Sequence, residues 1–552
     1  MKRILFTLCV VPLIGCSSSG ATVTCGPGTV LQDGTCVLGD GGTDSTLGDA
    51  DVGADAHDAA DSPAPDAAAE TLADASDATG GVDAADAQDG APDSPPVMLP
   101  WTRHFGGTGD DHPLGVLANA AGETIVHGFS QSPTIDLGNG AVTLTGGTPG
   151  FLAKIDPAGT TLWTKVYSAE GGGEIDAATQ AIDASGNIFV GGGLYHTTGV
   201  DFGDAKMTAP CGGSGSSGCA YVAKIDPSGK FSWGKFFAAS VAYLDGMVCD
   251  GTNVVLAGHF SGSIDFGLGL LSGVGSDNEI FLAKLGLDGT TTWAKRFNGG
   301  SAGSSSNGVA TDADGNVLVT GWFNGSIDFG GGPLVSAGGT DIFLAKFDKT
   351  GAHLWSQRFG DPAVEQGGMD VKADQAGNVV VEGYLTGSAN FGGGSLSAVG
   401  SGTRNLFVAK FTPSGTHVWS KVFGGSGGAT GAILAVDTMG GVLLTGAFGD
   451  SIDFGGGPLA GSTLAKGDMF LAKLTSAGAH VWSHHFGGPT SKWAVGVGVA
   501  SDPTRSAVVL AAFEGATDFD DGLFPGANYG PFGGPCSSGL VCEDIFLGRF
   551  SL

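Results

Sequence analysis

From position 101 to the end of the chain, apolar and polar residues alternate in short runs that are separated by Gly, Asn and Asp. Between residues 307 and 359 the pattern contains four such runs, NGVATDADGN, VLVTGWFNGSIDFGGG, DIFLAKFDKTG and HLWSQRF. Alternation over lengths of this kind predicts half-buried strands, and the residues between the runs are typical of tight turns. The sequence therefore predicts an all-β fold.

The same four-strand pattern recurs along the chain. Its most visible marker is a tryptophan in each fourth strand: Trp101, Trp163, Trp233, Trp293, Trp355, Trp419 and Trp482. Four strands per repeat are typical of a propeller blade. The first repeat begins with its fourth strand alone, at 101–105, and the last repeat ends after its third, at 545–550. Seven full blades form only if these two parts join, which also removes an exposed sheet edge. We predict a seven-bladed β-propeller over 97–552, closed by the N-terminal strand.

The repeats resemble the bacterial β-propeller repeat family often abbreviated SBBP. The residues that carry the resemblance are the DxxGN turns (183–187 and 374–378), the DFGGG segments (328–332 and 453–457) and FLAK with its variants. The resemblance covers about 101–552 and implies the propeller fold, whereas members of the family have no common activity. The turn 156–159 before Trp163 is also similar to the Asp-box of sialidases and to the tryptophan-docking repeat of quinoprotein dehydrogenases, with spacing that departs from both by one residue.

The first residues have the pattern of a targeting segment. Lys2 and Arg3 precede an apolar run at 4–14, which is too short for a membrane span. The following Leu-Ile-Gly-Cys, ending at Cys16, resembles the lipobox of bacterial lipoprotein precursors. The resemblance implies a signal peptide at 1–15, a lipid on Cys16 and a location at the bacterial outer membrane or cell surface. The alternative is an ordinary signal peptide that contains a cysteine.

Two further segments separate this start from the propeller. Residues 16–39 contain Cys25 and Cys36, which predict a small disulfide loop in an exported chain. Residues 40–96 are rich in Asp and Ala, carry no Lys or Arg and show no apolar periodicity. Such composition predicts a disordered acidic linker, with weak calcium binding by its carboxylates as the alternative.

The charge and the remaining cysteines limit the partners. The formal net charge is −31, and proteins that bind nucleic acid need clustered Lys and Arg, so we expect no nucleic-acid partner. Cys211 with Cys219, and Cys536 with Cys542, each flank a short loop between a second and a third strand, and we predict a disulfide for each pair. Cys249 is left over and is interpreted as a small buried residue.

Most basic residues occupy repeat positions. The FLAK lysines, such as Lys346, are interpreted as long side chains whose charged ends reach the rim. The histidines His353, His417 and His480 occupy one equivalent place in three blades, so they cannot share a metal ion. In 312–316 two Asp and one Asn could bind calcium, but Asp and Asn before Gly are also what a hairpin turn requires. We predict no catalytic, cofactor or metal site.

These observations predict a membrane-anchored surface lipoprotein whose propeller binds or scaffolds a protein or a glycan, without catalytic activity. We expect the membrane to be contacted through the N-terminal lipid, and the chain to be a monomer without cofactors. One alternative is a glycan hydrolase or lyase with a site at the mouth of the central channel. Another is a scaffold for outer-membrane assembly. An enzyme predicts non-repeat acidic and basic residues that meet at one end of the channel with shifted pKa values.

Overall fold

A computed structural model describes residues 29–32, 35–38, 101–208, 218–273, 278–298, 303–362, 365–400, 402–461, 467–487, 491–501, 506–515 and 543–551. The chain divides into two compact units, one of residues 11–90 and one that contains residues 91–552. In the first unit the described residues form the hairpin of β1 (Thr29–Gln32) and β2 (Thr35–Leu38). The predicted signal peptide, the lipidation residue Cys16 and the acidic linker lie outside the described residues. No helix in the described ranges is long and apolar enough to cross a bilayer.

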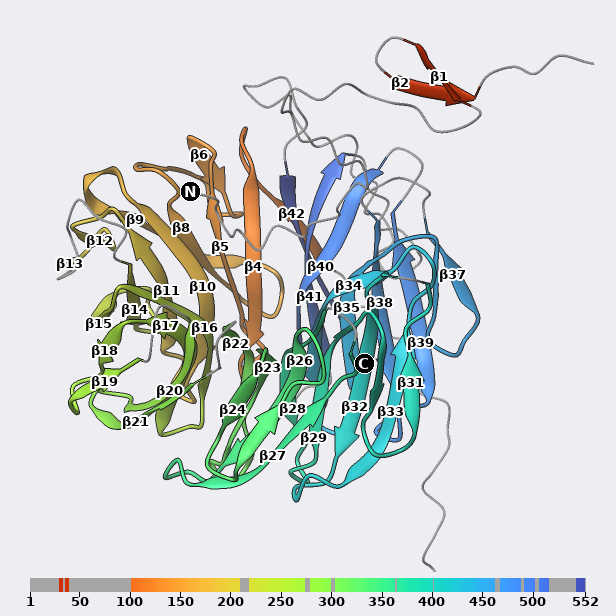
Figure 1. The fold of residues 1–552 in the computed structure, drawn as a ribbon. Coiled ribbons are helices and arrows are strands. Elements are labelled where there is room, and N and C mark those ends of the chain that lie inside the picture. The colour runs from red at the N-terminus through yellow and green to blue at the C-terminus, as the bar shows by residue number, and fades with distance from the viewer. Residues whose placement is uncertain are drawn as a thin grey trace, which may run out of the picture. The chain divides into compact units, whose positions relative to one another are not determined.

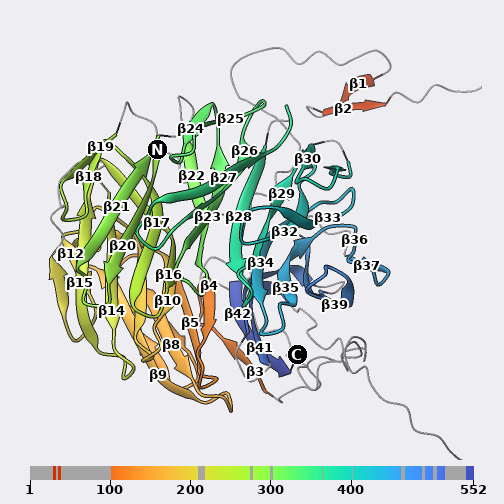
Figure 2. The same cartoon turned by 90° about the horizontal axis from the view of Figure 1, so that it is seen from below.

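The second unit is a seven-bladed β-propeller, in which each blade is an antiparallel sheet with four main strands (Figures 1 and 2). The innermost strands of blades 1 to 7 are β4 (Asp111–Ala118), β10 (Glu174–Ile182), β16 (Val241–Cys249), β22 (Ser304–Thr311), β28 (Gln366–Ala373), β34 (Ala429–Val436) and β40 (Ser491–Ser501). The second strands are β5 (Thr124–Ser130), β11 (Ile188–Tyr195), β17 (Asn253–Ser261), β23 (Val317–Phe323), β29 (Val379–Leu385), β35 (Val442–Phe448) and β41 (Ser506–Gly515). Each innermost strand contacts that of the next blade, and β40 contacts β4, so the ring is closed.

The outer half of each blade follows the same order. The third strands are β8 (Gly150–Ile155), β14 (Cys219–Ile225), β20 (Glu279–Gly286), β26 (Asp341–Phe347), β32 (Asn405–Phe411), β38 (Asp468–Leu474) and β42 (Glu543–Ser551). The outer strands are β9 (Thr161–Ala169), β15 (Phe231–Ala238), β21 (Thr291–Phe297), β27 (His353–Phe359), β33 (His417–Phe423), β39 (His480–Phe486) and, for blade 7, β3 (Trp101–Phe105). The strand β3 pairs with β42 in the register Trp101↔Arg549 to Phe105↔Ile545, which confirms the predicted closure.

Blades 1 to 6 each carry a small hairpin between the second and third strands. The hairpins are β6 (Thr134–Asp136) with β7 (Ala141–Thr143), β12 (Gly199–Asp201) with β13 (Lys206–Thr208), β18 (Ser263–Asp265) with β19 (Leu270–Ser272), β24 (Ser326–Asp328) with β25 (Pro333–Val335), β30 (Ser388–Asn390) with β31 (Ser395–Ser397), and β36 (Ser451–Asp453) with β37 (Pro458–Ala460). One short 3-10 helix, η1 (Glu170–Gly172), lies between blades 1 and 2. The DFGGG segment therefore forms the turn of a hairpin, as its glycines favour.

The hydrophobic core lies between adjacent blades. The Phe of each DFG segment inserts there: the ring of Phe329 lies 5.0 Å from Phe297 of blade 3 and 4.8 Å from Phe343 of its own blade. Because each interface takes side chains from two sheets, a blade alone could not bury its apolar faces.

The propeller has two faces, which are named here by their connections. The loop face carries the connections from second to third strands and from each outer strand to the next blade. The turn face carries the short turns from first to second and from third to fourth strands. Cys219 lies at the loop-face end of β14, and the DxxGN turns belong to the turn face.

Candidate functional site

Every innermost strand contains a β-bulge at the same level. In blade 3 the pairing with the second strand shifts between Leu244 and Gly246, and the other six blades shift at the equivalent place. Glycine on the second strand makes room for the bulge, since a Cβ on Gly321 would lie 2.0 Å from the carbonyl oxygen of Ser305. A bulge leaves one residue unpaired and changes the direction of its side chain. Its side chain can therefore serve a role outside the repeat.

In blade 3 the bulge residue is Asp245, and it forms a pair with a histidine. Its Oδ2 lies 2.7 Å from Nδ1 of His259 on β17, and the two side chains are 12% and 13% exposed. Burial raises the pKa of Asp245 although His259 lies beside it. Burial alone would lower the pKa of His259, but the adjacent Asp245 carboxylate outweighs it and raises that pKa. The pair therefore retains a proton more strongly than an isolated histidine does.

Aromatic rings and a second carboxyl group complete the arrangement. Tyr243 stacks on His259 with ring centroids 4.7 Å apart, and Tyr195 of blade 2 lies 5.7 Å from Tyr243. Asp176, on the innermost strand of blade 2, has its pKa raised to about 6 by burial and by the negative charges of Asp245 and a neighbouring glutamate. We call Asp176, Tyr195, Tyr243, Asp245 and His259 the channel-mouth cluster, since all five lie near the loop-face ends of β10, β11, β16 and β17.

The cluster does not belong to the repeat. The residues that correspond to Asp245 at the bulge are Ala178, Asn307 and Met369 in blades 2, 4 and 5. The position of His259 is held by Trp322 in blade 4 and by Tyr384 in blade 5. Because the other blades form without these groups, the fold does not require a carboxylate or an imidazole here.

The cluster has the properties of an acid–base site. A carboxyl group with a pKa of about 6, as in Asp176, can donate or accept a proton near neutral pH. The Asp245–His259 pair is a second proton carrier beside it, and neighbouring titratable groups with separately shifted pKa values are typical of catalytic sites. Sequence reasoning missed these residues. The available signal was a titratable residue that interrupts the repeat, as in LDG at 244–246 and GHF at 258–260.

A second polar group lies in blade 5. Nζ of Lys372 lies 2.5 and 2.7 Å from the two carboxylate oxygens of Asp370, which pairs across the sheet with Glu382. Glu382 is fully buried, and burial raises its pKa well above the ordinary value. Gln180, on the innermost strand of blade 2, is buried against Gly115 of blade 1.

On the turn face the FLAK lysines form ion pairs, which corrects the interpretation that their charged ends reach the rim. Nζ of Lys346 lies 2.8 Å from Oδ2 of Asp312 in its own blade, and both side chains are 4% exposed. The equivalent pairs are Lys154–Glu123, Lys224–Asp183, Lys284–Asp250, Lys410–Asp374 and Lys473–Asp437. Oδ1 of Asp312 also accepts the backbone N–H groups of Asp314 and Asn316. The first Asp of DxxGN therefore stabilises its own turn and also pairs with the lysine.

In the described ranges, no three His, Cys, Asp or Glu side chains meet as metal ligands would.

Blades 1 to 5 and blade 7 are each joined to the next blade by a hydrogen bond from the repeated tryptophan. Nε1 of Trp293 donates a hydrogen bond to the carbonyl oxygen of Lys349, which lies in a turn of the following blade, at 3.2 Å. The equivalent bonds are Trp101 to Pro157, Trp163 to Pro227, Trp233 to Leu287, Trp355 to Pro413 and Trp419 to Ser476. The three equivalent histidines are structural too, since each Nε2 lies 3.0 to 3.1 Å from the Oγ of a serine three residues later.

For each predicted disulfide, the described residues include at most one of the two cysteines. Cys36 lies on β2, opposite Leu31, and its predicted partner Cys25 lies outside the described residues. Cys219 begins β14, is fully buried and takes part in a disulfide. Its predicted partner Cys211 lies outside the described ranges, as do Cys536 and Cys542. The three pairings therefore stay predictions. Cys249 is a free thiol on β16, and burial raises its pKa to about 12.

The fold places the chain among the β-propeller proteins. No known protein family matches the chain. An uncharacterized WD repeat-containing protein of Acanthamoeba polyphaga mimivirus is 30% identical over 110 residues, which are 19% of this chain and 8% of that protein. The match thus spans only a small part of the relative's length, and that protein's properties do not carry over.

Solved structures show the likeness of fold alone. An ulvan lyase of a polysaccharide lyase family has a TM-score of 0.37 at 12% identity, and the match covers 74% of this chain and 93% of the lyase. The Hadza microbial sialidase Hz136 has a TM-score of 0.36 at 12% identity, with 61% and 63% covered. A protein of unknown function from Dyadobacter fermentans has a TM-score of 0.35 at 11% identity, with 82% and 98% covered.

The prediction that the chain is not an enzyme is contradicted. The solved structures of similar fold include puromycin hydrolase, the sialidase, a lignostilbene dioxygenase from Pseudomonas brassicacearum and the ulvan lyase. The prediction rested on the absence of a catalytic motif from the sequence. In a propeller, however, residues of neighbouring blades can interact, as Asp176 and Asp245 do, so a catalytic site would need no contiguous motif.

Proposed function

We propose that the propeller binds a glycan at the channel mouth and hydrolyses it by general acid–base catalysis. The observation that carries the proposal is the pair of largely buried carboxyl groups, Asp176 and Asp245, which come from neighbouring blades and interact electrostatically. Asp245 occupies a bulge position that the repeat leaves free and lies beside His259. Tyr243 stacks on His259, and Tyr195 lies beside Tyr243 and interacts electrostatically with both acids. A few polar groups beside aromatic rings are typical of ligand sites, and paired carboxyl groups are the usual catalysts of glycoside hydrolysis.

The shifted pKa values suggest a role for each acid. Asp176, with its pKa raised to about 6, is the proton donor to the departing glycosidic oxygen. The Asp245–His259 pair accepts a proton from the attacking water. One water is consumed, its hydroxyl group adds to the sugar carbon, and the bond to the departing oxygen breaks. The proton taken up by the pair replaces the one that Asp176 gave away.

The first test uses the full chain and a panel of soluble polysaccharides, with new reducing ends as the readout. We expect turnover of at least one glycan, and we expect Asp245→Asn to lower kcat by roughly 100-fold to 10,000-fold, because the amide cannot accept a proton. Asp176 loses the proton that it donates as the pH rises through about 6, whereas the Asp245–His259 pair must be free of its own proton to act as the base. Activity should therefore be highest between the pKa of Asp176 and the raised pKa of the pair, and should fall on both sides of that interval.

The matched control is Asp226→Asn, which removes the same charge from an exposed turn of blade 2 on the opposite face. This variant should keep the wild-type kcat. Three outcomes contradict the proposal: no turnover of any glycan between about pH 4 and pH 8, equal loss in both variants, or an unsaturated product without new water, which would indicate a lyase.

We further propose that the chain is a lipoprotein of the SBBP-type repeat family, anchored through Cys16 in a bacterial outer membrane. The support is the sequence of residues 1–20 and the repeat motifs. Because several acyl chains anchor a protein stably, Cys16→Ser should move the protein from the membrane fraction to the soluble fraction. The control Cys249→Ser removes the free thiol of the propeller and should stay with the membrane. Unchanged membrane retention of Cys16→Ser would disprove lipid anchoring.

A further inference from the structure

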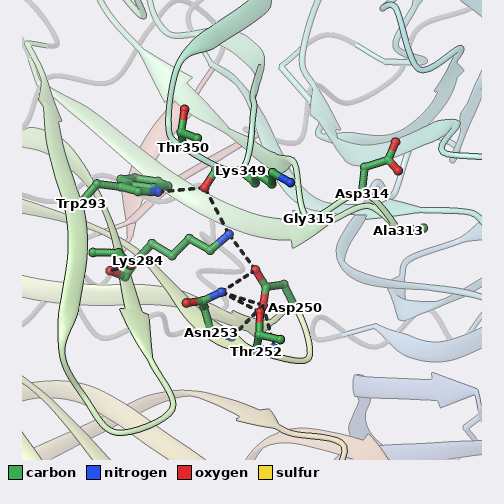
Figure 3. Close-up of a pocket in the computed structure, with 11 residues that line it drawn as sticks. Asp250, Thr252, Asn253, Lys284, Trp293, Ala313, Asp314, Gly315, Lys349 and Thr350 are labelled. Carbon is green, nitrogen blue, oxygen red and sulfur yellow. Dashed lines mark hydrogen bonds and ion pairs between the residues drawn. The ribbon is translucent and has the colours of Figure 1, made fainter.

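A pocket of about 570 Å³ lies on the turn face between blades 3 and 4 (Figure 3). Turn residues of blade 3 (250–253) and of blade 4 (313–315 and 349–350) line it together with Lys284 and Trp293. Its volume is within the range of small-molecule sites, which is about 300–1,000 Å³. The pocket is on the face opposite the channel-mouth cluster, so it is a separate feature.

The turn of blade 3 differs in length from its counterparts. The backbone N–H of Asn253 bonds to Oδ1 of Asp250 three residues earlier. In blade 4 the corresponding bond, from Asn316 to Asp312, spans four residues, and blades 2, 5 and 6 show the same span. Blade 3 thus lacks one turn residue at the place where the pocket lies. The pocket therefore coincides with a difference between blade 3 and the other blades, and it does not follow from the repeated pattern itself.

The lining is rigid on the inner side. Nζ of Lys284 lies 2.7 Å from Oδ2 of Asp250, and both side chains are 5% exposed. Trp293 is fixed by its bond to the carbonyl oxygen of Lys349 and by contact with Gly351, where an added Cβ would lie 3.1 Å from the indole ring. Figure 3 shows the stem of Lys284 running between Trp293 and Asp250. An aromatic ring and a buried charged group are therefore held in place before any ligand binds.

The charges of the lining balance. Lys284 and Lys349 carry positive charge, and Asp250 and Asp314 carry negative charge. Neither a strongly anionic nor a strongly cationic ligand gains from such a lining, because each would meet a like charge as well as an opposite one. The lining also contains neutral hydrogen-bonding groups, which are the hydroxyls of Thr252 and Thr350 and the side-chain amide of Asn253. The pocket favours a neutral ligand with many hydroxyl groups and one apolar face.

We infer that this pocket binds a neutral sugar unit, with the sugar's apolar face near Trp293 and its hydroxyl groups on the charged and polar lining. The inference does not depend on catalysis at the channel mouth. It gives the chain a second, non-catalytic glycan contact on its other face.

The test is saturation-transfer NMR on the full chain with methyl β-D-glucopyranoside, methyl β-D-galactopyranoside and methyl α-D-mannopyranoside. We expect binding of at least one with a Kd in the millimolar range, as a single sugar unit offers few atoms for contact. Trp293→Ala should weaken it roughly tenfold. The matched control is Trp355→Ala, which removes the equivalent tryptophan of blade 4, where the adjacent turn of that blade has the usual length.

A second variant fills the pocket without removing the tryptophan. Residues 250–253 are replaced by the five residues of the blade 4 turn, 312–316, which restores the usual turn length. This variant should fold as the wild type does and lose the part of the sugar signal that Trp293→Ala weakens, whereas any binding at the channel mouth should remain. The inference is overturned if none of the three sugars binds, if the lengthened turn leaves binding unchanged, or if glucuronate or glucosamine binds more tightly than the neutral sugars.

Discussion

A chain that begins at residue 107 should fail to form a stable propeller. This truncation removes β3, which supplies the outer strand of blade 7 and pairs with β42 over its whole length. It also removes Trp101 and Phe105, which are 6% and 2% exposed in the core between blades 7 and 1. Losing a single buried aromatic side chain costs about 3–5 kcal/mol, and the whole stability of a domain is about 5–15 kcal/mol. The truncation should therefore abolish cooperative unfolding.

The strand also connects the two ends of the ring. Nε1 of Trp101 donates to the carbonyl oxygen of Pro157 at 2.9 Å, and Nε of Arg103 donates to that of Gly159 at 2.7 Å. Both acceptors belong to blade 1. Without β3, blade 7 would lose these two hydrogen bonds to blade 1, and β42 would present an unpaired edge, which favours aggregation.

The measurement is size-exclusion chromatography followed by thermal unfolding. The control is a chain that begins at residue 97, which keeps β3 and should remain monomeric with the melting temperature of the full chain. A peptide of residues 97–106 added to the shorter truncation should restore part of the folded fraction. Equal melting temperatures for the two truncations would show that closure by β3 does not stabilise the ring.

The fold was predictable because the same sequence pattern recurs in every blade. Alternation in segments such as 341–347 and 353–359 indicates strands in each blade, and the position of the unpaired strand at 101–105 indicates ring closure. Turn residues of the DxxGN type mark the same place in each unit. These patterns involve residues that are close together in the sequence, so they can be recognised without knowing which distant residues are in contact.

The candidate site was not predictable in the same way. Asp176 and Asp245 are far apart in the sequence and meet only because their blades are neighbours. The bulge at Asp245 adds one residue to an otherwise regular strand. The alternation of apolar and polar residues does not reveal such an insertion. The partner of Lys346 was missed for a related reason. Alternation places that lysine on an inner face, whereas its pairing with Asp312 depends on how the turn folds back over the sheet.

Replacing Lys346 by methionine should lower the free energy of unfolding by about 3–5 kcal/mol, because it leaves the buried Asp312 carboxylate without its positive partner. The loss should appear as a lower urea midpoint in equilibrium unfolding. Burial alone would raise the pKa of Asp312, but the hydrogen bonds from Lys346 and Asn316 outweigh burial and hold that pKa below its usual value. A lowered carboxylate pKa stabilises the folded state at neutral pH.

The pH dependence separates this ion pair from ordinary packing. In the wild type the contribution of Asp312 is present above about pH 4 and is lost as the pH falls through its lowered pKa. The difference in stability between the wild type and Lys346→Met should therefore shrink on acidification. The control Lys349→Met removes an exposed lysine three residues away and should change stability by less than about 0.5 kcal/mol. A pH-independent loss in Lys346→Met would show that the lysine stabilises the blade through its aliphatic stem rather than through its charge.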